Sequence, residues 1–214
     1  MSFDKARELI DNSLLFNKII EFNRAFNISA APESDSASHL FLKKKDANLY
    51  LFKKRERKGS FIPFYAEPDR LCLIDNKTLS LLSMYLGSAV LYKSLQQILF
   101  KQDRELLFSF LDRSIYDFTL SCGRYSLPHE LVMSDIIDLS SLKDAIVSHG
   151  CACLSALASL MTDERLKEHF TARIKDLSPL DFKVVDNEHA MAIYKLCIRI
   201  LTQEIDTTWL KYFA

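Results

Sequence analysis

The chain has 214 residues, of which 49% are hydrophobic and 26% charged, and its 28 Lys and Arg residues balance 28 Asp and Glu residues. This length suits one domain, or one domain with a small appendage, and the composition excludes a wholly disordered chain. A formal net charge of zero excludes a general DNA-coating protein, because that activity needs a broad excess of positive charge.

The N-terminal part, residues 1–67, is predicted to form an appendage that begins with a helix and a linker. Apolar residues at helical spacing predict an amphipathic helix, and they are Leu15, Ile19, Phe22 and Phe26. Residues 27–38 lack this pattern and predict an exposed linker.

Short extended segments are predicted to follow the linker. Two apolar-rich runs, 39–43 and 49–53, lie on either side of a polar turn and predict a small β-hairpin. Residues 61–65 are a further extended candidate, because Pro63 restricts its neighbours.

Residues 68–214 are predicted to form a compact multi-helix domain, so that the fold class is mainly α with a small N-terminal β-hairpin appendage. Asp75 or Asn76 can cap a helix that reaches about Leu99. A second helix is expected from Asp103 towards Cys122.

Further helices are expected towards the C-terminus. Ser140 or Ser141 can cap a helix of small residues, and Thr162 can cap the next one. Ser178-Pro179 is typical of a helix start, and the last helix is predicted at 188–205. An apolar tail containing Trp209 follows it.

Small residues four positions apart predict one close helix pair. They are Ser83 and Gly87 in the first helix and Ser148, Ala152 and Ala156 in the small-residue helix. Small side chains let two backbones approach closely, so we expect these two helices at the centre of the domain.

The cysteines and the uncharged stretches favour a soluble cytoplasmic protein. An odd number of cysteines without framework spacing indicates reduced thiols; they are Cys72, Cys122, Cys151, Cys153 and Cys197. The first residues lack the apolar run of a signal peptide. The uncharged stretches 78–92 and 145–162 are too short, or too rich in small polar residues, for a membrane span.

The sequence predicts no catalytic, cofactor-binding or metal-binding residues, and therefore a protein that is not an enzyme. The best metal candidate is His149 with Cys151 and Cys153, but residues two apart on a helix point in different directions. Cys122 or Cys151 could serve as a nucleophile only with a distant histidine. Asp135 and Asp138 are explained by capping before a helix.

One strongly charged segment stands out, and we call it the basic strip. It places eight positive residues within 16 positions, against Asp46 and Glu56. The eight are Lys43, Lys44, Lys45, Lys53, Lys54, Arg55, Arg57 and Lys58. They form either a solvated hairpin edge or a binding site for an anionic partner, which can be a protein, a lipid surface or a nucleic acid. Tyr50 and Phe52 fit strand alternation without base stacking.

Parts of residues 68–205 resemble the SctK family of bacterial type III secretion accessory proteins. The resemblance begins at Pro68-Asp-Arg-Leu-Cys-Leu-Ile and continues through Leu81-Leu-Ser-Met-Tyr-Leu-Gly-Ser-Ala-Val-Leu-Tyr and helices like 95–120. It then includes Asp144-Ala-Ile-Val-Ser-His-Gly-Cys-Ala-Cys-Leu-Ser-Ala-Leu and Tyr194-Lys-Leu-Cys-Ile-Arg-Ile. Within the family, the overall pattern is most similar to the EscK branch.

This resemblance implies a cytoplasmic, non-enzymatic adaptor of the secretion sorting platform. Family members bridge the cytoplasmic domain of the inner-membrane ring protein (SctD) to the pod protein (SctQ). The expected partners are therefore these two proteins, at the cytosolic face of the inner membrane, with no small-molecule substrate or nucleic acid. The alternative prediction is a helical module that binds anionic lipid or nucleic acid through the basic strip.

Overall fold

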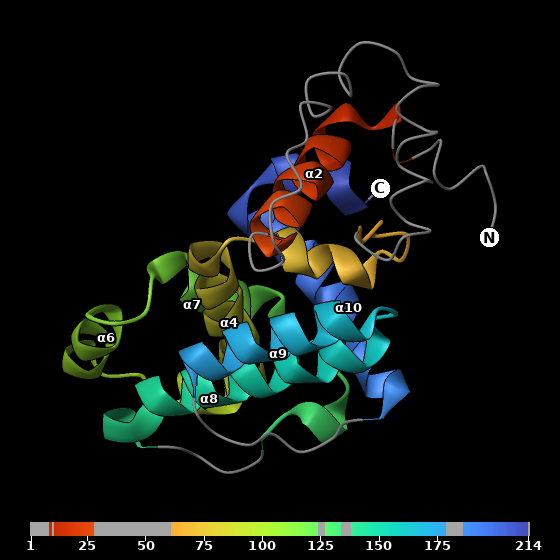
Figure 1. Ribbon diagram of the computed structural model, residues 1–214. Helices are drawn as coiled ribbons and strands as arrows, with labels where there is room; N and C mark the ends of the chain where they lie inside the picture. The colour runs from red at the N-terminus through yellow and green to blue at the C-terminus, as the bar shows by residue number, and fades with distance from the viewer. Residues whose placement is uncertain are drawn as a thin grey trace. The chain divides into compact units, whose positions relative to one another are not determined.

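A computed structural model describes residues 9, 11–27, 61–123, 127–133, 138–178 and 186–213 (Figure 1). These residues are mainly helical and none of them forms a β-strand, which confirms the mainly α prediction for the described part of the chain. The predicted β-hairpin and the basic strip lie outside the described residues. The chain divides into two compact units, one ending at Leu73 and joined by 208–214, the other spanning Ile74–Thr207.

Unit 1 contains the predicted amphipathic helix. This helix, α2, covers Ser13–Asn27 and buries Leu15 and Ile19 at 2% and 0% exposure. Phe22 and Phe26 are half-buried and stack on each other, with ring centroids 5.4 Å apart. The helix prediction is therefore confirmed, and its apolar stripe faces the core of unit 1.

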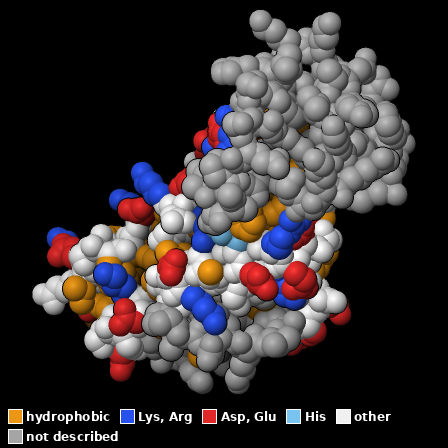
Figure 2. Space-filling model, viewed as in Figure 1, with side chains coloured by type: hydrophobic (Ala, Val, Ile, Leu, Met, Phe, Trp, Pro, Cys, Tyr) orange, Lys and Arg blue, Asp and Glu red, His pale blue; other side chains and the backbone are white. Residues whose placement is uncertain are grey.

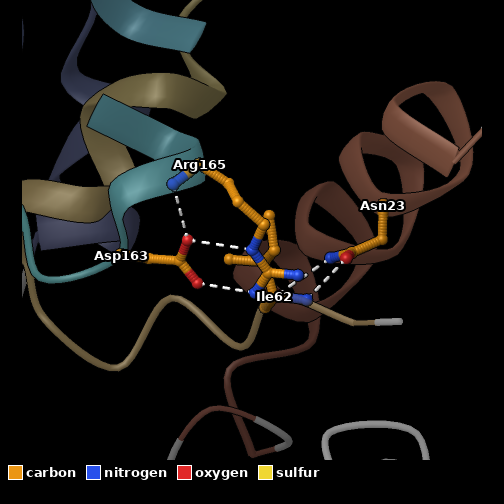
Figure 3. Close-up of polar contacts among 4 residues, drawn as sticks. All are labelled: Asn23, Ile62, Asp163 and Arg165. Atoms are coloured by element: carbon orange, nitrogen blue, oxygen red, sulfur yellow. Dashed lines mark hydrogen bonds and ion pairs between the residues drawn. The ribbon is translucent and has the colours of Figure 1, made fainter. Parts of the chain in front are cut away.

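Residues 61–65 form an irregular segment attached to α2, not an extended one throughout. Phe64 has a φ of 55°, in the left-handed region that bulky residues rarely adopt. Its buried ring packs edge-on against Phe22 at 5.0 Å between centroids. The segment is also joined to α2 by hydrogen bonds between Asn23 and Ile62 (Figure 3).

The C-terminal residues complete unit 1. The 3₁₀ helix η2 covers Pro68–Leu73, and its buried Arg70 donates a hydrogen bond from Nη1 to the Tyr212 carbonyl at 2.8 Å. Asn12 donates a second hydrogen bond to the Lys211 carbonyl. These bonds hold α11, which covers Leu210–Phe213, so the predicted apolar tail is a short helix with a fixed place in unit 1.

Unit 2 is a set of helices joined by short irregular segments. The α-helices are α4 (Asn76–Val90), α5 (Tyr92–Gln96), α6 (Lys101–Phe108), α7 (Arg113–Ser121), α8 (Leu139–Leu157), α9 (Glu164–Leu177) and α10 (Asn187–Arg199). The shorter elements are the 3₁₀ helices η4 (His129–Leu131), η5 (Ala158–Leu160) and η7 (Thr207–Trp209, which begins at the end of unit 2) and the π-helix η6 (Ile200–Ile205).

Aspartates begin several of these helices. Asp75 accepts a hydrogen bond from the Thr78 backbone N–H, which confirms the predicted cap of α4. The cap of α9 is Asp163, one residue later than the predicted Thr162, and its carboxylate also accepts two hydrogen bonds from the Arg165 guanidinium (Figure 3). A carboxylate satisfies a free backbone N–H at a helix start better than a hydroxyl does, because it also complements the helix dipole.

Two segments that were each predicted to form one helix each form two helices. The first is interrupted at Leu91, where the backbone leaves helical geometry between α4 and α5. The second does not run from Asp103 to Cys122, because α6 ends at Phe108 and Asp112 begins α7.

One further predicted helix start is wrong, and the one predicted at Ser178-Pro179 lies at the edge of the described residues and stays a prediction. The N-cap of α8 is Asp138, so that Ser140 and Ser141 lie in its first turn. Ser178 ends α9, and the residues that follow it lie outside the described part.

The closest helix contact in unit 2 is the crossing of α4 and α8, which lie side by side (Figure 1). A Cβ on Gly87 would lie 1.8 Å from the Ile146 carbonyl oxygen, and one on Gly150 would lie 1.9 Å from the Ser83 carbonyl oxygen. The predicted role of Ser83 and Gly87 is confirmed. The α8 residues at the crossing are Ile146 and Gly150, and the predicted Ser148, Ala152 and Ala156 are not the ones that permit this approach.

Side-chain hydrogen bonds fasten the first turn of α4 to α9. The Arg173 guanidinium donates to the Asn76 Oδ1 at 2.9 Å and to the Ile74 carbonyl. Within the described ranges, no helix is long and apolar enough to cross a membrane, even though α8 has 19 residues.

Candidate protein-contact surface

None of the eight predicted binding residues lies in the part of the chain that the structure describes. The basic strip falls entirely within residues 28–60, which the structure does not describe, so its proposed role stays a prediction. The surface described below is one that the sequence interpretation missed.

Helix α6 lies at the edge of unit 2 (Figure 1). Leu107 is the buried residue of this helix, at 0% exposure, and the Phe108 ring meets Tyr116 of α7 edge-on at 5.4 Å between centroids. Lys101 and Glu105 form an ion pair at 3.7 Å along the exposed side. The single buried residue fixes which side of the helix faces outward.

Large apolar side chains are exposed around this helix. Unit 2 and unit 1 together expose seven large hydrophobic residues among those described, and four of them lie within ten positions of each other. The four are Leu99 (69% exposed), Phe100 (76%), Leu106 (54%) and Phe108 (38%). With about 200 Å² for a fully exposed large side chain, they leave on the order of 500 Å² uncovered. Leu106 and Phe108 are two positions apart on the helix and point to different sides, so the exposed apolar area is distributed around α6.

The charged residues of α6 lie between these apolar ones. Lys101, Arg104, Glu105 and Phe108 are spaced i, i+3, i+4 and i+7, so they share one face, and they line a shallow hollow of about 370 Å³. Figure 2 shows hydrophobic side chains beside positive and negative ones at the left edge, where α6 lies. We call the apolar residues 99, 100, 106 and 108 together with this charged face the α6 surface.

The backbone carbonyl of Leu99, just before α6, accepts a hydrogen bond from within the chain. Arg104 donates a hydrogen bond from Nη2 to the Leu99 carbonyl at 2.6 Å, and Phe100 begins the helix with an extended backbone and no side-chain cap. A large apolar residue in the position that usually holds Ser, Thr or Asp is unfavourable for an isolated helix start. An exposed aromatic ring at this position does not stabilise the helix start, so helix stability does not account for it.

The two candidate thiols of α8 are buried. Burial raises the pKa of Cys151 to about 11, against a hydrogen bond with Ser83 that lowers it, and burial raises the pKa of Cys153 to about 12. Burial also lowers the pKa of His149. Both thiols therefore stay protonated at neutral pH, whereas metal binding and nucleophilic attack require a thiolate.

No group of three or more metal-ligating side chains occurs in the part of the chain that the structure describes. Asp138 occupies the N-cap position of α8 but its side chain makes no cap hydrogen bond, and Asp135 lies outside the described residues. Comparison with known proteins finds no matching family model, no matching curated protein and no matching solved structure.

Proposed function

We propose that the chain is a non-enzymatic adaptor of a bacterial type III secretion sorting platform, bridging an SctD-like inner-membrane ring protein to an SctQ-like pod protein. The observation that carries the adaptor class is the α6 surface, since four of the seven exposed large hydrophobic residues among those described gather on and just before this one helix. The choice of the secretion platform depends on the resemblance of residues 68–205 to the SctK family.

Three features of the described residues suit a protein that works by contact. The α4–α8 crossing at Gly87 and Gly150 makes unit 2 a close-packed body. The buried thiols are protonated and unreactive at neutral pH. The two units each supply a surface of their own, and a bridging protein must bind at least two partners.

The test is co-purification of the tagged full chain from its own cells, with the bound proteins identified by mass spectrometry. We expect the ring protein and the pod protein among them. Recovery of neither protein from cells that assemble the platform would overturn the secretion assignment.

A charge-reversed variant tests the part that the basic strip plays in this adaptor. The triple variant Lys53→Glu, Lys54→Glu and Arg55→Glu should weaken recovery of one partner and make the remaining binding less dependent on salt, because steering between opposite charges is screened by ions. The matched control reverses three exposed lysines of unit 2, Lys143, Lys175 and Lys195, and should leave recovery unchanged.

The alternative function is binding of anionic lipid or nucleic acid, which the local excess of positive charge in the basic strip favours. It predicts that the purified chain binds vesicles containing anionic lipid, or RNA, at physiological salt without a protein partner. The same triple variant should then lose this binding, while co-purification of ring and pod proteins would not be observed.

A further inference from the structure

We propose that unit 1 contains a binding site for the end of a helix from a partner protein, and that α11 of the same chain fills this site in the structure. We call it the helix-end site and define it by Asn12, Arg70 and the part of α2 that packs on α11. The inference goes beyond the proposed function, because it involves neither the α6 surface nor the identity of the secretion proteins.

The helix-end site holds α11 through its main chain. Arg70 Nη1 donates a hydrogen bond to the Tyr212 carbonyl at 2.8 Å, and Asn12 Nδ2 donates one to the Lys211 carbonyl. The carbonyl groups in the last turn of a helix have no partners inside the helix, so unit 1 satisfies two consecutive groups of this kind. Every amino acid carries a backbone carbonyl, and these two bonds therefore do not select a particular sequence.

The side chains of α11 add little to this attachment. None of the four is buried: Leu210 is 53% exposed, Lys211 is exposed, and Tyr212 and Phe213 are half-buried. A helical turn with other side chains at the two exposed positions would make the same hydrogen bonds to Asn12 and Arg70.

One aromatic side chain supplies the buried contact. Trp209 lies directly before α11 and is 8% exposed. The rings of Tyr212 and Phe213 lie beside it, with centroids 5.1 and 6.4 Å from its own, so these ring contacts are made within the segment itself. A partner helix that fills the site therefore needs one large aromatic residue three positions before the carbonyl that Arg70 binds.

The charge of Arg70 favours a longer helix than α11. A cation is stabilised at the C-terminal end of a helix, because the aligned peptide dipoles place partial negative charge there. Helix α11 has only four residues, and the dipole of a longer helix is larger. The end of a longer partner helix should therefore replace α11, although α11 belongs to the same chain.

Binding of a synthetic peptide of residues 205–213 to the purified full chain tests the site. The linkage of α11 gives it an effective concentration of about 1 mM, so the wild-type chain should bind the peptide only at about that concentration. The full chain with Trp209→Ala, in which α11 is weakened, should bind it at least about tenfold more tightly. Fluorescence anisotropy of a dye on the peptide measures both affinities. Because the chain has one tryptophan, a shift of the peptide's tryptophan emission to shorter wavelength reports its burial in this variant.

A second substitution, Asn12→Asp in the Trp209→Ala chain, removes the donor to the helix end. It keeps Oδ1, which accepts a hydrogen bond from the Leu15 N–H at 3.2 Å at the start of α2, but places a negative charge beside the carbonyl. Peptide affinity should fall about tenfold or more. The matched control is Asn17→Asp on the exposed side of α2, which should leave the affinity unchanged.

Altered peptides test which features of the ligand are recognised. A peptide with Leu210→Ala and Lys211→Ala should bind within about threefold of the original, because both side chains are exposed. A peptide with Trp209→Ala should not bind measurably.

Absence of binding to the folded Trp209→Ala chain would overturn the proposal, as would equal binding by its Asn12→Asp derivative. If Trp209→Ala unfolds unit 1, the peptide should raise the melting temperature of the variant, and an unchanged temperature would be equally decisive. Loss of binding by the peptide with two alanines would assign the site to α11 alone. A wild-type chain that sediments as a dimer without peptide, and loses the dimer on Asn12→Asp, would assign it to a second copy, contrary to the proposal.

Discussion

Asn23 and Ile62, 39 positions apart in the sequence, are joined by two hydrogen bonds. The Ile62 backbone N–H donates to Asn23 Oδ1 at 2.7 Å, and Asn23 Nδ2 donates to the Ile62 carbonyl at 2.9 Å. Asn23 Nδ2 also donates to the Ile19 carbonyl of the preceding helical turn at 2.8 Å. The side-chain amide therefore replaces the partner that a neighbouring strand would offer to the Ile62 backbone, at a site where Asn23 is 4% exposed.

Removal of this amide should destabilise unit 1. In Asn23→Ala the N–H and C=O groups of Ile62 would stay buried without partners, which costs about 1–3 kcal/mol for each group. We expect a loss of about 3 kcal/mol in the free energy of unfolding, measured by denaturant titration. The single tryptophan, Trp209, is buried in unit 1, so its fluorescence reports this transition.

The matched control is Asn17→Ala, at an exposed asparagine on the same helix. It makes the same chemical change without removing the bonds to Ile62, and should alter stability by less than about 0.5 kcal/mol. Equal effects of the two substitutions would contradict the structural role of Asn23.

The α4–α8 crossing should tolerate no side chain at either glycine. Gly87→Ala and Gly150→Ala each place a Cβ less than 2 Å from a backbone carbonyl oxygen of the other helix, which cannot rotate away. We expect each to lower the free energy of unfolding by about 3 kcal/mol or more, at or beyond the usual upper range for overpacking. Thermal melting followed by circular dichroism gives the measurement.

Gly123→Ala is the control for that series. Its added Cβ would lie 3.5 Å from the Ala89 Cβ, an ordinary van der Waals contact. We expect a change of no more than about 1 kcal/mol. A Gly87→Ala variant with the same melting temperature as the wild type would show that the two helices do not cross at this residue.

Thiol labelling should separate one cysteine from the rest. Cys122 is half-buried at the end of α7, whereas the other four are buried, at 0–6% exposure. A thiol reagent at neutral pH should therefore modify Cys122 first, and the rest only as rapidly as the chain unfolds. Mass spectrometry of the labelled protein counts the modified residues, and in denaturant all five should react. A second thiol that reacts at once in the native protein would disagree with the packing of η2, α8 or α10.

Mild acid should destabilise unit 2 through two histidines. Burial lowers the pKa of His149, and burial together with the nearby Arg173 charge lowers that of His169. The unfolded chain then binds more protons than the folded one below about pH 6.5, so stability falls as the pH decreases. We expect this loss between about pH 7 and pH 5, above the usual range of carboxylates.

The double variant His149→Gln/His169→Gln tests this origin. It should flatten the dependence of the unfolding free energy on pH over the same window, because the groups that take up the protons are gone. The control is His129→Gln, at an exposed histidine of η4, for which we expect the wild-type slope. An unaltered slope in the double variant would assign the pH dependence to other groups.

Local sequence patterns predicted where most of the helices lie, and they predicted one side of one contact between helices. Asp75 was recognisable as a cap, and the spacing of Ser83 and Gly87 correctly predicted a close approach. The residues opposite them on α8 were predicted wrongly, because small residues lie on several sides of that helix. A spacing shows which residues share a face but not which face meets another helix.

The α6 surface was missed because α6 and α7 were interpreted as one helix. Phe108 and Asp112 lie only four residues apart, and the apolar pattern continues across the break between them. A continuous helix would distribute its apolar residues over a buried stripe, whereas the break leaves Leu106 and Phe108 exposed. The Asp112 N-cap was the available signal. The return of residues 208–213 to unit 1 depends on contacts distant in sequence, such as Arg70 with Tyr212, which no local pattern records.

Unit 1 is built from two segments, one before and one after unit 2 in the sequence. This arrangement sets the order in which the chain can fold during synthesis. Domains usually fold as they leave the ribosome, N-terminal part first. Here α11 packs on α2, but the whole of unit 2 must be translated before α11 exists. Unit 2 can therefore fold while the part of α2 that α11 will cover is still exposed, although residues 61–65 can already pack on the helix. In that interval a chaperone could bind this exposed part of α2.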